Sequence, residues 1–184
     1  MRNALLGIFF YLFASAATAD DNFEAVKSQL IADNPTADLS GITYENNALN
    51  LGETEINDIS ALSGLTALER LSLRDTEISD VNALSGLTAL KGLDLSFTEV
   101  SDANALNGLT ALELLNLSFT EVSDVSALNG LTALEVLLLS GTPVSDISAL
   151  SGLTALELLN LDDTPVSDVS AIQHLIDSGL KIYQ

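Results

Sequence analysis

Apolar and polar positions follow one another along this chain in a pattern that returns every 22 residues. The string Leu-Thr-Ala-Leu begins at Leu65, Leu87, Leu109, Leu131 and Leu153. Five units follow in register, at residues 65–86, 87–108, 109–130, 131–152 and 153–174. A weaker sixth unit precedes them at 43–64 and carries an inserted residue near its start. Self-similarity at a fixed period indicates a protein built from stacked structural repeats.

Each unit combines the periods of two kinds of secondary structure. In the unit at 65–86, the string Leu-Ser-Leu at 71–73 alternates apolar and polar residues, which predicts a short strand. Ile78, Val81 and Leu84 follow at a spacing of three, which predicts a short helical turn. Neither element can bury its apolar face alone, whereas stacked copies place the leucines in columns that share one continuous core.

The repeat has the form Leu-x-x-Leu-x-x-Leu-x-Leu-x-x-Thr-x-Val-x-Asp-Val-x-x-Leu-x-Gly, and it resembles the leucine-rich repeat of bacterial internalins over residues 43–174. The resemblance implies an α/β leucine-rich repeat solenoid, with a parallel sheet on the concave face and short 3₁₀ or helical turns on the convex face. One departure is a column of threonines where that family usually has asparagine, at Thr54, Thr76, Thr98, Thr120, Thr142 and Thr164. Because a hydroxyl is shorter than an amide, the departure puts the usual side-chain bridges between turns in doubt, but not the fold.

Residues 1–19 have the three-part pattern of a secretory signal peptide. Arg2 is followed by an apolar run at 5–14 and then by small residues that end at Ala19. The alternative is a retained membrane anchor, but the run is shorter than the roughly 20 residues that span a bilayer. The sequence therefore predicts an extracytoplasmic protein, periplasmic or secreted, without stable membrane insertion after cleavage.

The two ends of the repeat array differ from its middle, as an open stack of repeats requires. Residues 20–42 are expected to form an N-terminal helical cap, with a helix at 21–33 whose first turn Asp21 or Asn22 can cap. Six repeats, the first degenerate, fill 43–174, and a C-terminal cap at 175–184 is expected to hold a helix and a last strand. The two caps predict a complete protein.

Charge and composition exclude several classes of function. The formal net charge is −20, and removal of the signal peptide leaves 26 acidic and five basic residues. Nucleic-acid binding needs clustered Lys and Arg, which this chain lacks. The sequence has no cysteine, which excludes disulfides, thiolate metal sites and a cysteine nucleophile.

Three columns of acidic or hydroxyl side chains invite interpretation. Six aspartates precede the helical turns, at Asp58, Asp80, Asp102, Asp124, Asp146 and Asp168. We expect them to cap these turns by accepting backbone N–H bonds. We expect divalent cations to associate with this column weakly and non-specifically rather than at dedicated calcium sites. A second column accepts either Glu or Pro, ending in Pro143 and Pro165, so we expect it to face water without an N–H partner. Outward threonines from Thr66 to Thr154 leave open an ice-associated structural role.

Hydrolytic chemistry is the least favoured hypothesis. His174 is the single histidine, with Asp177 one helical turn away, and no Gly-x-Ser-x-Gly nucleophile elbow occurs. A serine triad needs a positioned base and an oxyanion hole. We therefore predict no enzyme activity, no catalytic or metal-ligating residues, and no cofactor.

In a repeat protein the framework repeats, whereas the recognition surface is free to vary. Outward strand positions are basic in one unit and aliphatic in later units, which predicts an exposed apolar patch and hence an interface. The predicted partner-binding residues are Arg70, Arg74, Phe97, Leu114, Phe119, Val136, Leu138 and Leu158. By resemblance to internalins, the leading function is non-catalytic protein binding in adhesion or surface recognition.

Overall fold

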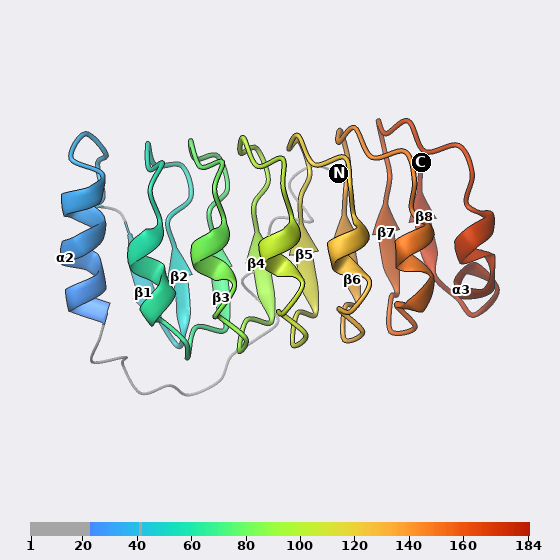
Figure 1. Ribbon diagram of the computed structural model, residues 1–184, viewed down its shortest axis with the longest axis horizontal. Coiled ribbons are helices and arrows are strands. Elements are labelled where there is room, and N and C mark those ends of the chain that lie inside the picture. Colours follow the sequence, from blue (N-terminus) through green and yellow to red (C-terminus); the bar gives the residue numbers. More distant parts are fainter. Residues whose placement is uncertain (1–22, 41) are drawn as a thin grey trace.

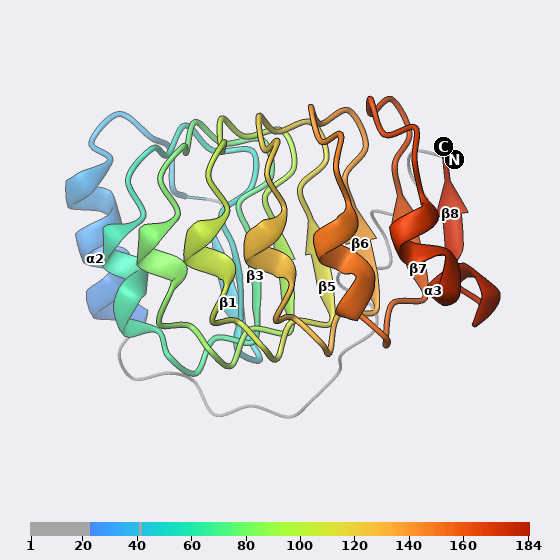
Figure 2. The ribbon, with the colours of Figure 1, turned by 45° about the vertical axis from the view of Figure 1, so that its right-hand side comes forward.

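The computed structural model describes residues 23–40 and 42–184, so the predicted signal peptide and the capping residues Asp21 and Asn22 lie outside the described residues. The described chain winds into a row of similar coils, each contributing one strand to a single sheet (Figure 1). The eight strands lie in the sheet in their order along the chain. Figure 2 shows the short helical turns on the side opposite the sheet. The predicted solenoid of parallel strands and 3₁₀ turns is confirmed.

Seven parallel strands make up most of the sheet. They are β2 (Ala48–Asn50), β3 (Arg70–Ser72), β4 (Gly92–Asp94), β5 (Leu114–Asn116), β6 (Val136–Leu138), β7 (Leu158–Asn160) and β8 (Lys181–Tyr183). From β2 to β7 each residue pairs with the residue 22 positions further along the chain, as Leu71 does with Leu93. The sequence period is therefore the register of the sheet.

The sheet begins with a strand that the repeat pattern did not predict. β1 (Thr43–Glu45) pairs antiparallel with β2 through a two-residue loop, Asn46 and Asn47, whose φ angles are 54° and 56°. Two central residues with positive φ define the turn type that suits a two-residue hairpin, and asparagine tolerates this conformation. The opening of the degenerate first unit is therefore a hairpin.

Six short 3₁₀ helices line the convex side. They are η1 (Ser60–Gly64), η2 (Asn82–Leu84), η3 (Asn104–Leu106), η4 (Ser126–Leu128), η5 (Ser148–Gly152) and η6 (Ser170–Ile172). In every one, the aspartate two residues upstream accepts a bond from the first backbone N–H, as Asp124 Oδ1 does from Ser126 at 2.8 Å. The predicted capping role of the aspartate column is confirmed.

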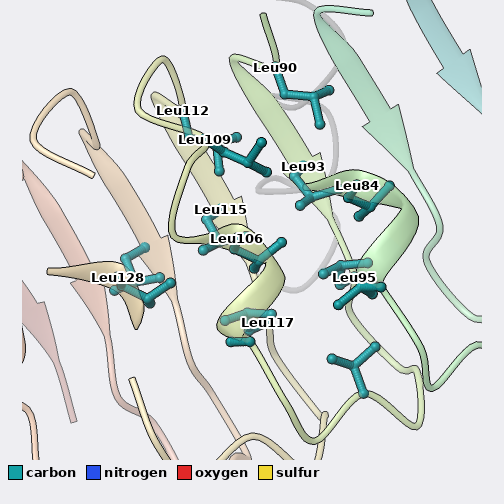
Figure 3. Packing of buried hydrophobic residues seen from close by; sticks show 14 of the residues in the cluster. Leu84, Leu90, Leu93, Leu95, Leu106, Leu109, Leu112, Leu115, Leu117 and Leu128 are labelled. Carbon is teal, nitrogen blue, oxygen red and sulfur yellow. The ribbon is translucent and has the colours of Figure 1, made fainter. Parts of the chain in front are cut away.

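The leucine columns fill the space between the sheet and the 3₁₀ helices. Figure 3 shows Leu84 and Leu106, from the convex side, reaching toward strand-side leucines such as Leu93 and Leu115. All four side chains are fully buried. Burying a leucine is worth about 1.5–3 kcal/mol, so these columns dominate the stability of the fold.

The threonine column makes local bonds and does not bridge adjacent coils. Each of the six hydroxyls donates to the carbonyl of the leucine three residues earlier, as Thr98 Oγ1 does to Leu95 at 2.6 Å. A hydroxyl suits this task because it can rotate toward a carbonyl inside its own turn. The side-chain hydrogen bonds of this column therefore close the turn after each strand.

One expectation was wrong for the column that holds Glu in the first coils and Pro in the last two. We expected these positions to need no N–H partner, yet Glu77, Glu99 and Glu121 donate their backbone N–H to the carbonyls of Ile56, Ile78 and Val100 in the preceding coil, at 2.9–3.0 Å. Proline has no N–H, so Pro143 and Pro165 cannot continue this series.

Helices cover the core at both ends of the described chain. The N-terminal helix α2 (Phe23–Asp33) buries Val26 and Leu30, and its Phe23 ring stacks on Tyr44 of β1 at 4.4 Å. The buried Asn34 joins this helix to the first repeat, because its Oδ1 accepts bonds from the N–H groups of Asn57 and Asp58.

At the other end, α3 (Gln173–Asp177) extends η6, and the chain then turns at Gly179, where φ is 115°, into β8. A helix and a last strand were expected at this end, and the helix begins two residues before the expected start of the cap at 175. Within residues 23–40 and 42–184, no helix has the length and apolar character needed to cross a membrane.

Candidate functional site

Four predicted residues lie side by side on the outer face of the sheet. Leu114, Val136 and Leu158 pair in register across β5, β6 and β7, and Leu138 is two residues beyond Val136. These four side chains, here called the aliphatic patch, are half-buried. The leucine between Val136 and Leu138 is fully buried. Because successive residues of a strand point to opposite faces, the aliphatic patch lies on the face away from the core.

Leu138 differs from its neighbours in the same row. The residues that pair with it on either side are Asn116 and Asn160. Each of these asparagines accepts a bond through its Oδ1 from the backbone N–H two residues later, at Ser118 and Asp162. Leu138 cannot make this bond, so nothing in the repeat framework calls for leucine at this position.

A second cluster lies just past the strands and is here called the aromatic strip. It consists of Arg74, Phe97 and Phe119, which come from three successive coils. The rings of Phe97 and Phe119 stack with centroids 4.6 Å apart, and the Arg74 guanidinium lies 4.6 Å from the Phe97 centroid. Arg74 also donates to Ser96 Oγ at 3.3 Å. Phe97 remains 39% exposed.

Both phenylalanines adopt an uncommon backbone conformation. Phe97 and Phe119 have φ angles of 59° and 58°, in the left-handed region. The equivalent positions of other coils share it, with Glu53, Asp75, Gly141 and Asp163 all at positive φ. Side chains other than glycine pay roughly 1–2 kcal/mol for this conformation. Two bulky aromatic residues in such a column are therefore not explained by backbone preference.

Arg70 departs from the predicted site. We expected it to be available on the outer face, but it is only 7% exposed, and its Nη2 donates to the backbone carbonyl of Asn46 at 3.1 Å. That carbonyl belongs to the loop of the β1–β2 hairpin, so the long side chain folds back onto a structure that the repeat pattern did not predict. Arg70 therefore ties the hairpin to β3.

A buried carboxylate borders the aliphatic patch. Asp94, which pairs with Asn116 across β4 and β5, is 6% exposed and accepts bonds from the backbone N–H and the hydroxyl of Ser96 at 2.9 and 2.6 Å. Burial raises the pKa of Asp94, and the Ser96 bonds and the nearby Arg74 charge offset this only in part. The sequence gave no signal of this burial.

The groups considered for catalysis are not brought together. The His174 ring contacts the backbone carbonyl of Ser151 at 2.9 Å, and Asp177 accepts a bond from Gln173. Among the described residues, no group of three or more His, Cys, Asp or Glu side chains is placed to hold a metal ion. Two surface depressions, one lined by Glu53 and Glu77 and one by Asp58 and Asp80, lie between neighbouring turns outside the aliphatic patch.

Comparison with known proteins agrees with this architecture. A family model described as leucine-rich repeats in two copies matches residues 132–174. Among solved structures, internalin C2 of Listeria monocytogenes is similar, with 33% identity over 69% of this chain and 56% of that chain, and a TM-score of 0.67. Comparison with curated protein sequences found no match.

Two further structures extend the similarity. A second internalin of Listeria monocytogenes, InlF, has 28% identity over 74% of this chain and 47% of that chain, with a TM-score of 0.63. A leucine-rich repeat protein of Leptospira interrogans shares the fold at 24% identity over 74% of this chain and 36% of that chain, with a TM-score of 0.68. The chain thus spans about half the length of the two internalins.

Proposed function

We propose that this chain, an internalin-like leucine-rich repeat protein, is a non-catalytic protein-binding module that recognises its partner on the concave face of the sheet. The observation that carries the proposal is the aliphatic patch, in which four neighbouring apolar side chains lie on the face opposite the core. A contiguous apolar patch outside the core is typical of an interaction site.

The aromatic strip supports the same face as the binding site. Aromatic residues and arginine are enriched among the residues that dominate binding energy in protein interfaces. Leu114, Phe119 and Leu138 therefore belong to the proposed contact surface, together with Arg74, Phe97, Val136 and Leu158. Arg70 lies in the same row as Leu114, two strands away, and holds the hairpin.

The size of the face limits the strength of binding. Strands about 4.8 Å apart, each presenting a few residues, give a flat area of roughly 400 Å² for six strands. A standard stable interface buries about 800 Å² on each partner. We therefore propose a modest, transient interaction rather than a permanent complex.

We place this interaction outside the cytoplasm, periplasmic or secreted, with adhesion or surface recognition as its role. The support for the compartment is the signal-peptide pattern at 1–19, and the support for the role is the likeness to internalins. On this proposal, cleavage leaves an N-terminal cap at 20–42, repeats at 43–174 and a C-terminal cap at 175–184.

Affinity capture from an extracytoplasmic fraction tests the proposal. The bait is used as wild type, as Leu138→Asp and as Asn129→Asp, which adds the same negative charge at an exposed residue that follows η4 on the convex side. We expect wild type and Asn129→Asp to retain the same protein and Leu138→Asp to lose it, with all three folded by circular dichroism. Equal capture by the three baits would contradict binding through the aliphatic patch.

A further inference from the structure

We propose that the partner presents a cationic, amphipathic segment, in which Lys or Arg side chains flank apolar residues that pack on the aliphatic patch. This inference rests on the proposed function and adds the chemistry of the partner. It is drawn from the distribution of charge around β5, β6 and β7.

No lysine or arginine occurs between Lys91 and Lys181, a stretch that includes all three strands of the aliphatic patch. Acidic residues lie along the edge where these strands begin. Glu113, Glu135 and Glu157 directly precede the first residues of β5, β6 and β7. Glu135 and Glu157 are exposed, and Glu113 is half-buried. The patch therefore lies beside a row of carboxylates. The neighbouring cations of this chain are Lys91, one coil before Glu113, and the exposed Lys181, which pairs with Leu158 across β7 and β8, so Glu135 at the centre of the row has neither lysine in an adjacent coil.

The same row shows, one coil earlier, how such a carboxylate is neutralised. Lys91 occupies this position before β4, and its Nζ lies 2.8 Å from Glu69 Oε2 in the preceding coil. The hydrogen bond from Lys91 lowers the pKa of Glu69. Side chains of this row can thus meet across adjacent coils, and an ammonium satisfies a carboxylate there. No equivalent ion pair is made by Glu113, Glu135 or Glu157 within the described part of the chain.

Like charges on adjacent strands repel one another, and the repulsion grows when a partner displaces water. A partner without positive charge would remove water from these carboxylates and offer no opposite charge in its place, which costs free energy. An anionic partner would add repulsion, and such like-charge contacts are a common means of rejecting wrong partners. A Lys or Arg from the partner would instead take the place that Lys91 takes beside Glu69.

The other edge of the face has the same sign. Asp162 and Asp163 follow β7, and the exposed Glu121 lies two residues beyond Phe119 of the aromatic strip. A segment lying across the aliphatic patch thus meets carboxylates at both ends and aliphatic side chains in the middle. This order of charges and apolar surface is complementary to basic residues on either side of an apolar anchor.

Three synthetic peptides of equal length test the inference against the purified full chain. They share one set of leucines and carry lysine, glutamine or glutamate at the remaining positions, and binding is measured by fluorescence anisotropy at two salt concentrations. We expect the lysine peptide to bind most tightly, the glutamine peptide more weakly and the glutamate peptide not at all. Tighter binding of the glutamine or glutamate peptide would overturn the inference.

Because any basic peptide is attracted to a strongly acidic protein, variants must locate the contact. Glu135→Lys installs the residue that Lys91 provides at the equivalent position, and Leu138→Asn installs the residue found at Asn116 and Asn160, so both suit the framework. Glu55→Lys makes the same charge change at an exposed residue of the first coil, away from the patch. We expect Glu135→Lys to weaken lysine-peptide binding by roughly threefold to tenfold, and Glu55→Lys to have little effect.

The variants separate the failure of this inference from the failure of the proposed function. If Glu135→Lys and Glu55→Lys weaken binding equally, the attraction comes from total charge and the inference is overturned, while a loss in Leu138→Asn would still support binding at the patch. If Leu138→Asn binds the lysine peptide as wild type does, the patch is not the contact surface and both proposals are overturned.

Discussion

The ring of Phe119 lies directly over the backbone of Gly141 in the next coil, and a Cβ atom added to Gly141 would come within 2.6 Å of the ring's Cδ1 atom. Gly141 has a φ of 69°, so glycine serves both the backbone conformation and the close approach of the ring. The aromatic strip therefore ends on a residue without a side chain, and this relationship fixes where Phe119 and Phe97 can stack.

Gly141→Ala is expected to destabilise the protein by about 1–2 kcal/mol from the left-handed backbone alone, with a further loss because the Phe119 ring must move. Urea unfolding followed by circular dichroism measures the change. Gly86→Ala is the matched control, because a Cβ there would meet no atom within 4 Å. Equal stability of the two alanine variants would show that the contact between Phe119 and Gly141 carries no constraint.

Leu117→Ala is expected to destabilise the fold by about 2–5 kcal/mol, because Leu117 is fully buried and its truncation leaves a cavity. Leu138→Asn, on the opposite face of the next coil, should change the unfolding free energy by no more than about 0.5 kcal/mol. Denaturant titration of both variants compares the two faces of the sheet. A larger loss for Leu138→Asn than for Leu117→Ala would reverse the assignment of core and binding face.

Asp94→Asn is expected to raise the melting temperature at neutral pH. Burial raises the pKa of Asp94 above its ordinary value, so its contribution to stability is present in acid and is lost as pH rises through that raised value. Asparagine removes the buried charge and can still accept the Ser96 N–H bond, as Asn116 does from Ser118. The gain over wild type, followed by calorimetry, should shrink as pH falls, and a constant difference at all pH values would exclude this cause.

Asp124→Ala is expected to lower the melting temperature at neutral pH through loss of a 3₁₀ cap. The backbone N–H and hydroxyl of Ser126 lower the pKa of Asp124, so the carboxylate stabilises the fold above its ordinary pKa and loses this effect as pH falls through the lowered value. The difference from wild type should therefore fade in acid. Glu121→Ala, which removes an exposed carboxylate without a cap bond, is the control, and an equally large loss there would argue against capping.

Raising the ionic strength is expected to raise the melting temperature of the chain without residues 1–19, because salt screens repulsion among its 26 acidic residues. Calcium chloride and sodium chloride at matched ionic strength should have similar effects if cations act diffusely. Melting curves that do not move between low and high salt would count against this view. A calcium effect that saturates at low concentration would point instead to defined sites.

How far the sequence predicted the fold depends on whether a feature repeats. The register of Leu71 with Leu93, the caps made by the aspartates and the juxtaposition of Leu114 with Val136 all follow from one period. Among features that occur once, the terminal helices were predicted, but others were missed because a single instance gives no period. The Asn46–Asn47 hairpin is the main example, and it also explains why Arg70 is buried.

Two further properties could not be predicted because they depend on contacts between coils. Phe97 and Phe119 were predicted to contact the partner, but nothing in the pattern indicates that phenylalanine adopts a left-handed φ there. The N–H groups of Glu77 and its equivalents were assigned to water because proline replaces glutamate at Pro143. In the structure, each glutamate of this column from Glu77 to Glu121 donates its backbone N–H to a carbonyl of the preceding coil. The prolines of the column have no N–H, so they make no such bond.

The replacement of glutamate by proline changes how adjacent coils are joined. From the coil of Glu77 to the coil of Glu121, adjacent coils are joined by the hydrogen bonds of the sheet and also by the backbone N–H bond of the glutamate column. Pro143 and Pro165 cannot make this second bond. The coils that contain Pro143 and Pro165 are thus joined to the preceding coil by one backbone hydrogen bond fewer than the coils that contain Glu77, Glu99 and Glu121. Val136, Leu138 and Leu158 of the aliphatic patch belong to these two coils, so the proposed contact surface lies where the array has the fewest backbone bonds between successive turns.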